Sequence, residues 1–149
     1  LTYWPQLFLG ITFNWGIVMA STAISNEIPL NIIIIYLSAI FWTLGYDTIY
    51  GTQDISDDEI IGVKSTSIKF KKNLRFFVTI CYLVSFSLIL WVFKNKLDLN
   101  MITFLICLYF FTLIYQIKIF KLNDSSSCLK AFKINNLTGL ILFGMFNLI

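Results

Sequence analysis

The chain has 149 residues, of which 58% are hydrophobic and 17% aromatic, while only 13% are charged. Its mean hydropathy is +0.80, and the composition predicts a membrane protein rather than an unusually apolar soluble helical domain. A net charge of +3 with lysines spread along the chain, and the absence of histidine, argue against nucleic-acid binding, a Cys/His zinc site and a catalytic histidine.

Five stretches are apolar over the roughly 20 residues that a helix needs to cross a bilayer. In chain order they run from Trp4 to Ile24, Leu30 to Gly51, Leu74 to Phe93, Met101 to Phe120 and Ala131 to Ile149. Strands of a membrane barrel are about half as long and alternate polar with apolar residues, unlike these stretches. The sequence therefore predicts a single all-α membrane domain, a bundle of five transmembrane helices.

Basic residues are distributed unevenly among the connections between these spans. The four connections, with their flanks, carry 0, 5, 2 and 4 of the eleven lysines and arginines in chain order. The positive-inside rule then places the second and fourth connections in the cytoplasm. We therefore expect the N-terminus inside and the C-terminus outside.

The second connection contains four acidic residues, Asp54, Asp57, Asp58 and Glu59, in a chain that is otherwise poor in charge. If the second span continues through them as one helix at about 100° per residue, Asp47, Asp54 and Asp58 share one face within roughly 40°. Clustered carboxylates repel each other and are costly to desolvate, and a bound cation removes both penalties. Mg²⁺ typically takes one or two carboxylates together with water and a substrate phosphate.

A lysine follows the acidic stretch at a short distance. Lys64 comes after a turn predicted at Gly62, where it is placed to meet an anionic group. Carboxylates, a hard cation and a lysine at a membrane face together indicate a diphosphate site. A solvated charged loop that maintains topology and solubility explains the same residues, so the pattern alone leaves both interpretations open.

The segment YDTIYGTQDISDDEIIGVKSTSIKF, residues 46–70, closely resembles the second aspartate-rich motif of the UbiA superfamily of membrane prenyltransferases. Its elements Y-D-T-x-Y, D-x-x-x-D and G-x-K-S-T are those of the 4-hydroxybenzoate polyprenyltransferase branch. WPQLFLGITFNWG, residues 4–16, and CLKAFKINNLTGLILF, residues 128–143, resemble the same branch. Gly51 and Ser67 stand where the branch usually carries alanine, and we expect neither change to disturb the site.

The resemblance implies a nine-helix fold with two aspartate-rich motifs. The first motif, N-D-x-x-D-x-x-x-D, has no match here, and the five spans correspond to helices five to nine. We therefore expect residues 1–149 to be the C-terminal portion of one prenyltransferase domain, inactive without the first motif and about four further helices. A natural half-protein that needs a partner is the alternative.

The resemblance further implies Mg²⁺-dependent transfer of a polyprenyl group from polyprenyl diphosphate to the ring of 4-hydroxybenzoate, in ubiquinone biosynthesis at the bacterial inner membrane. By position, Asp54 and Asp58 are the expected metal ligands and catalytic residues, and Lys64 binds the diphosphate as a point charge. The candidate substrate-binding residues are Asp47, Tyr50, Asn14 and Asn135.

Each of these assignments has a structural alternative. Lys64 and Tyr50 are also typical of anchors at the membrane interface, and Asp47 of a residue that orients a metal ligand. Asn14 and Asn135 are typical of hydrogen bonds between membrane helices.

Three other functions remain open. A homogentisate, chlorophyll or haem-type prenyltransferase shares the fold and the metal chemistry. A CDP-alcohol phosphatidyltransferase also carries D-x-x-x-D, but its D-G-x-x-A-R element is absent. A non-catalytic membrane protein predicts that neutralising Asp54 or Asp58 leaves prenyl transfer unchanged. The expected partners are the two substrates, the lipid bilayer and the remaining helices, without nucleic acid.

Overall fold

The computed structural model describes residues 2–122 and 124–148, which form helices and contain no sheet. The helices are α1 (Pro5–Phe13), α2 (Trp15–Ser25), α3 (Leu30–Tyr50), α4 (Ile55–Ile61), α5 (Thr66–Lys69), η1 (Lys71–Asn73), α6 (Leu74–Phe93), η2 (Lys94–Lys96), α7 (Met101–Ile119), α8 (Ser125–Lys133) and α9 (Asn135–Phe146).

Polar residues at the ends of the apolar runs set several helix boundaries. Asn26 ends α2 in the left-handed conformation with φ 56°. The Asn100 side chain accepts the Thr103 N–H at the start of α7, 3.0 Å away. Asp124 caps α8 in the same way, and hydrogen bonds from the Ser126 hydroxyl and the Ser127 N–H hold the pKa of its carboxyl below the usual range.

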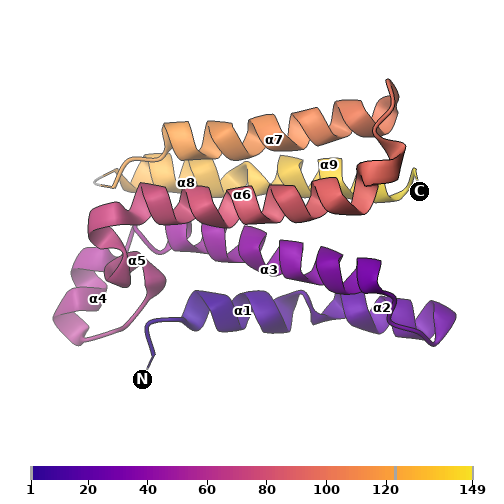
Figure 1. The fold of residues 1–149 in the computed structure, drawn as a ribbon. Coiled ribbons are helices and arrows are strands. Elements are labelled where there is room, and N and C mark those ends of the chain that lie inside the picture. Colours follow the sequence, from indigo (N-terminus) through magenta and orange to yellow (C-terminus); the bar gives the residue numbers. More distant parts are fainter. Residues whose placement is uncertain (1, 123, 149) are drawn as a thin grey trace.

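The long helices lie roughly along one axis (Figure 1). The pair formed by α3 and α6 is the most extensive contact in the molecule. The α1–α2 segment covers one side of α3, while α7 and the α8–α9 segment pack on the other side of the pair. The short helices α4 and α5 lie beyond the end of α3, and the first and last described residues lie at opposite ends of the bundle.

Four of the five predicted spans are helices long and apolar enough to cross a membrane: residues 5–25, 30–50, 71–96 and 101–119. The first is divided at Asn14 between α1 and α2. The last predicted span is divided at Ile134 between α8 and α9 and does not meet these criteria within the described residues. That span remains a prediction, and its final residue, Ile149, lies outside the described part of the chain.

The second span ends at Tyr50, close to the predicted boundary at Gly51, so it does not continue as one helix through the acidic stretch. Just after α3, the N–H and the hydroxyl of Thr52 both donate to the Ile49 carbonyl in the last turn of the helix, at 3.1 and 2.6 Å. The Ser67 hydroxyl donates to the Thr48 carbonyl at 2.7 Å. These partners satisfy carbonyls that a further helical turn would otherwise use, so the chain is free to change direction.

Glycine allows the central pair of helices to approach closely. Tyr82 of α6 lies against Gly45 of α3, and both are buried. The Tyr82 hydroxyl donates to Gln116 of α7, whose amide donates to Thr138 of α9 at 3.2 Å. This buried chain of hydrogen bonds links α6, α7 and α9. It also holds the Tyr82 ring in its position against Gly45.

A second buried hydrogen-bond network lies further along the pair. Ser38 of α3, Ser85 of α6 and Tyr109 of α7 meet through their hydroxyls, with oxygen–oxygen distances of 2.9 and 2.8 Å. Every buried side-chain nitrogen and oxygen in the described part of the chain has a hydrogen-bond partner. The interior is thus compatible with an apolar solvent that supplies no hydrogen bonds.

Candidate active site

The D-x-x-x-D pair lies at the start of α4. Asp54 precedes the helix, and its carbonyl accepts the Asp58 N–H at 2.8 Å, so the two side chains lie on successive turns of one face. Asp54 is exposed and Asp58 is half-buried. Among the described residues, neither carboxylate has a hydrogen-bond or ion-pair partner. Both therefore retain open oxygens for an external ligand.

The last acidic residue of the stretch has a different role. Both carboxylate oxygens of Glu59 accept from the Lys71 ammonium, at 3.0 and 2.9 Å. Such an exposed pair contributes little to stability. The pair occupies Glu59 and leaves Asp54, Asp57 and Asp58 without a partner among the described residues; of these, Asp54 and Asp58 have the four-residue spacing.

Asp47 does not join these carboxylates in one cluster. It lies half-buried in the last turn of α3, separated from α4 by the turn that follows Tyr50. No group of three acidic, histidine or cysteine side chains in residues 2–122 and 124–148 is arranged to hold a metal ion. A single face of three carboxylates would require an unbroken helix, and α3 and α4 are separate helices.

The two open carboxylates still fit Mg²⁺. This ion commonly binds through one or two carboxylates and completes its octahedron with water and substrate phosphate oxygens. Asp54 and Asp58 supply such a partial set of hard oxygen donors. The assignment of these two residues as ligands remains a prediction.

The K-S-T element fixes the loop that follows α4. Ser65, Thr66 and Ser67 are all buried. The Thr66 N–H donates to the Gln6 side-chain carbonyl at 3.0 Å, and its hydroxyl lies 2.7 Å from that of Thr48. Ser65 accepts the Ile68 N–H at 3.2 Å and caps α5. These contacts attach the loop to both α1 and α3.

These positioning residues were not identified from the sequence, although a signal was present. Gln6 is an amide within an apolar run, and such a group inside a membrane span is expected to have a specific partner. Ser65 carries the side chain preferred at the start of a helix.

The predicted turn before Lys64 is confirmed, since Gly62 ends α4 in the left-handed region with φ 75°. The Lys64 side chain is exposed, and its ammonium lies 5.4 Å from the centre of the Tyr3 ring. No carboxylate within the described residues pairs with it. The ammonium is open to an anion, and its role in diphosphate binding stays a prediction.

Both candidate asparagines make hydrogen bonds between helices. The Asn14 amide donates to the Thr43 hydroxyl on α3 at 2.9 Å. Asn135 accepts the Trp42 indole N–H at 3.1 Å and donates to a carbonyl of α8 at 2.9 Å. Each amide thus has the structural role that membrane helices commonly give it, and contact with substrate remains a prediction.

Tyr50, the remaining candidate substrate-binding residue, is 41% exposed. Its ring contacts that of Phe132 on α8, with 4.7 Å between the ring centres. This contact packs Tyr50 against α8, and both a role in substrate binding and a role as an anchor at the membrane interface stay predictions.

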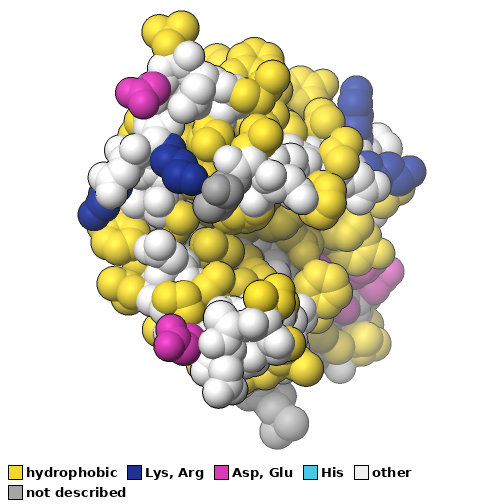
Figure 2. All heavy atoms as spheres, turned by 90° about the vertical axis from the view of Figure 1, so that its right-hand side faces the viewer, with side chains coloured by type: hydrophobic (Ala, Val, Ile, Leu, Met, Phe, Trp, Pro, Cys, Tyr) yellow, Lys and Arg dark blue, Asp and Glu magenta, His cyan; other side chains and the backbone are white. Residues whose placement is uncertain are grey.

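A cavity of about 550 Å³ lies between α2, α3 and α9, with walls from α6 and α7. It follows α3 from Ile32 to Trp42, so it ends five residues before Asp47. Most of the lining is apolar, and Ser38, Ser85 and Tyr109 contribute hydroxyls. Figure 2 views the bundle from the end away from α4, where hydrophobic side chains cover much of the surface and a hollow lies near the middle.

A sequence profile described as the UbiA prenyltransferase family matches residues 1–137. The chain belongs to the UbiA prenyltransferase family. It is 36% identical over 143 residues to the 4-hydroxybenzoate octaprenyltransferase of Serratia proteamaculans, covering 96% of this chain and 49% of the relative.

Other relatives of this UbiA family member carry similar names. The 4-hydroxybenzoate octaprenyltransferase of Psychromonas ingrahamii is 39% identical over 150 residues, which cover 97% of the chain and 51% of that protein. The mitochondrial 4-hydroxybenzoate polyprenyltransferase of Arabidopsis thaliana is 48% identical over 79 residues, 52% of the chain and 19% of the relative. The chain spans about half the length of the two bacterial relatives. No solved structure gives a significant match.

Gly51 and Ser67, the two positions at which the resemblance leads us to expect alanine, lie close to each other. An alanine Cβ at residue 51 would lie 2.7 Å from the Ser67 hydroxyl oxygen, which is too close for an ordinary contact. Gly51 leaves room for the Ser67 hydroxyl, which donates to the end of α3. The absence of a Cβ at Gly51 and the hydrogen bond of Ser67 are therefore coupled.

We expect Gly51→Ala alone to destabilise the UbiA protein by about 1–3 kcal/mol through overpacking. Ser67→Ala alone removes one hydrogen bond, for a loss of about 1 kcal/mol. Because the second change removes the clash caused by the first, the double variant should lose less than the sum of the two. Thermal unfolding of the four proteins in detergent measures this coupling, and additive losses would contradict it.

Proposed function

We propose that the protein transfers a polyprenyl group from a polyprenyl diphosphate to the ring of 4-hydroxybenzoate, in an Mg²⁺-dependent step of ubiquinone biosynthesis. The observation that carries the proposal is the open Asp54 and Asp58 pair at one end of a bundle of membrane helices. Family membership and the printed names of the relatives support the choice of substrates. The whole activity is a proposal, since the chain spans about half of those relatives.

Asp54 and Asp58 would hold Mg²⁺. The bound ion would neutralise the charge that develops on the leaving diphosphate. Lys64, with its open ammonium, would contact the same diphosphate as a point charge. Asp47 lies at the membrane end of α3, where its carboxylate would orient a ligand or a bound water. These residues bind and position; they do not form a covalent bond to the substrate.

In the proposed reaction the allylic carbon–oxygen bond breaks and both of its electrons leave with the diphosphate. The ring carbon beside the acceptor hydroxyl forms the new carbon–carbon bond, and loss of its proton restores the aromatic ring. Apolar walls, such as those of the cavity along α3, would exclude water from the reacting carbon. The polar networks around that cavity are internally paired and keep its shape.

We also propose that the helices correspond to helices five to nine of a nine-helix domain, with the α8–α9 segment as the last span. The acidic loop would face the cytoplasm at a bacterial inner membrane, because the two most basic connections lie at that end.

The proposal is tested with membranes that contain the full-length protein. We expect transfer from a polyprenyl diphosphate to labelled 4-hydroxybenzoate, lost on chelation of divalent cations and restored by Mg²⁺. Activity only with another aromatic acceptor would retain the metal chemistry and reject 4-hydroxybenzoate. Transfer that persists after chelation would reject the proposed metal site.

A further inference from the structure

A basic hollow lies where the loop meets the start of α6, outside the proposed active site. It encloses about 380 Å³ and is lined by residues 68–73, which include Lys69, Lys71 and Lys72. The hollow begins immediately before the apolar run of α6, so it lies at the level where a bilayer changes from hydrocarbon to headgroups. Residues 60–97 contain no acidic residue.

Aromatic side chains hold one of these lysines in place. The Lys69 ammonium lies 4.2 Å from the centre of the Trp4 ring and 5.6 Å from that of Phe70. Phe70 stacks on Phe77 with a 3.9 Å separation and an interplanar angle of 7°. The ammonium therefore lies against aromatic rings from the residue before α1 and the residue after α5, the latter stacked on Phe77 of α6.

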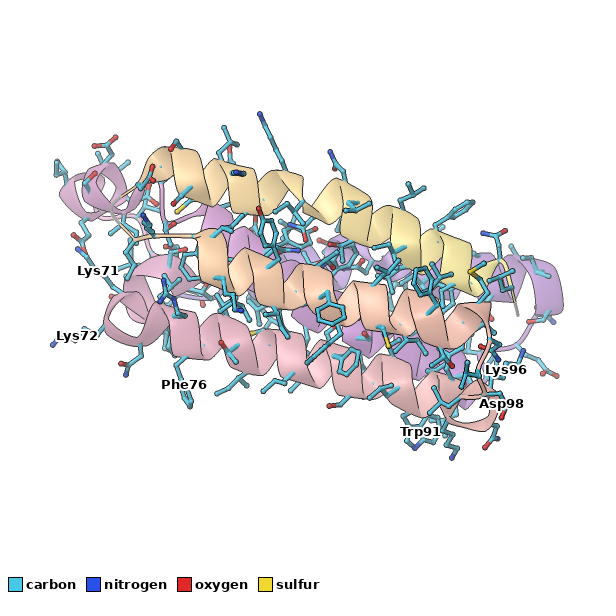
Figure 3. All side chains as sticks on the ribbon, turned by 90° about the horizontal axis from the view of Figure 1, so that it is seen from above. Lys71, Lys72, Phe76, Trp91, Lys96 and Asp98 are labelled. Atoms are coloured by element: carbon cyan, nitrogen blue, oxygen red, sulfur yellow. The ribbon has the colours of Figure 1, made fainter. Side chains whose placement is uncertain are left out.

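The other two lysines differ in their partners. Lys71 is neutralised by its ion pair with Glu59. Lys72 is exposed and has no carboxylate partner among the described residues. Figure 3 shows Lys71 and Lys72 projecting from the same end of the bundle. Lys69 and Lys72 thus supply the uncompensated positive charge.

An apolar stripe continues from the hollow along α6. Phe76, Ile80 and Leu83 are 68%, 42% and 52% exposed and occupy positions i, i+4 and i+7. Figure 3 shows Phe76 pointing away from the bundle just beyond Lys72. From Phe76 to Leu83 the stripe is about 10 Å long, most of the roughly 15 Å hydrocarbon depth of one leaflet. The positive charge of the hollow and the apolar stripe on α6 are complementary to an amphiphile with an anionic headgroup and an apolar chain.

We propose that this hollow binds an anionic phospholipid, whose phosphate contacts Lys69 and Lys72 and whose acyl chain lies along Phe76, Ile80 and Leu83. This site differs from a diffuse positive surface, because the Lys69 ammonium has a fixed position and the phosphate fits into a hollow of defined shape. The site therefore distinguishes one headgroup from another. Phosphatidylglycerol should therefore bind more tightly than phosphatidylcholine, whose headgroup carries no net charge.

The test uses the full-length protein, delipidated in detergent and titrated with phosphatidylglycerol or phosphatidylcholine while native mass spectrometry counts bound lipids. For the first lipid bound, we expect phosphatidylglycerol to be preferred by at least about 5-fold. The double variant Lys69→Gln/Lys72→Gln should bring this ratio close to one. The matched control Lys130→Gln/Lys133→Gln removes two exposed lysines from α8 and should retain it.

Three results would overturn the proposal. Equal affinity for the two lipids in the unaltered protein would show that the hollow does not select anionic headgroups. An equal loss in both double variants would show that only net charge matters. Displacement of phosphatidylglycerol by millimolar inorganic phosphate would assign the hollow to a soluble anion. Prenyl transfer is not the readout, so the result is independent of the proposed reaction.

Discussion

Replacing Asp54 with alanine in the full-length protein is expected to lower kcat/KM for prenyl transfer by more than about 100-fold, because the loss of a metal ligand exceeds the usual effect of residues that only orient one. The carboxylate has no partner among the described residues, so its removal leaves no buried group unsatisfied. The Mg²⁺ concentration needed for half-maximal activity should rise. Steady-state assays over a range of Mg²⁺ concentrations give both quantities.

The matched control for this substitution is Asp57→Ala. Asp57 is exposed on the same short helix, but one residue before Asp58 and therefore about 100° away from it. The two alanine variants change the charge of the loop equally, and only the first should lose activity. Equal activities of Asp54→Ala and Asp57→Ala would show that the acidic stretch is a solvated charged loop and not a metal site.

Gly45→Ala is also expected to destabilise the protein. An added Cβ would lie 2.7 Å from Cδ1 of the Tyr82 ring and closer still to Cε1. The ring has little freedom to move, because it is buried and its hydroxyl is bonded to Gln116. We expect a loss of about 1–3 kcal/mol from overpacking, measured by thermal unfolding in detergent.

Gly16→Ala is the corresponding control. Gly16 also lies in a helix, but a Cβ there meets no atom within 4 Å. Alanine has the higher helix propensity by about 1 kcal/mol, so this variant should be neutral or slightly more stable. A similar loss of stability at both glycines would show that contact with Tyr82 is not the cause.

Composition and apolar run length were sufficient to predict the all-helical architecture and four spans, since both follow from the thickness of a bilayer. They were not sufficient to show where a span bends. At the first break, between α1 and α2, the Asn14 amide donates to the Thr43 hydroxyl of α3, 29 residues further along the chain. Hydropathy does not report such contacts.

The acidic stretch shows the same limit. The four-residue spacing of Asp54 and Asp58 agrees with the hydrogen bond from the Asp58 N–H to the Asp54 carbonyl at the start of α4. The face does not extend to Asp47, because α3 ends at Tyr50, where Thr52 bonds locally to Ile49 and Ser67 donates from 19 residues away to the Thr48 carbonyl. Local periodicity thus predicted the pair of carboxylates, and tertiary contacts determined their relation to the rest of the chain.

The hydrogen bond from Thr66 to Gln6 joins residues that are 60 positions apart. A contact between such distant parts of a chain forms only after a large loop has been closed, so it tends to form late in folding. The acidic loop should therefore reach its final position after α1, α3 and α6 have come together. Since α1 is synthesised before the loop, the Gln6 carbonyl is already in the membrane when Thr66 leaves the ribosome, and the order of synthesis favours correct assembly.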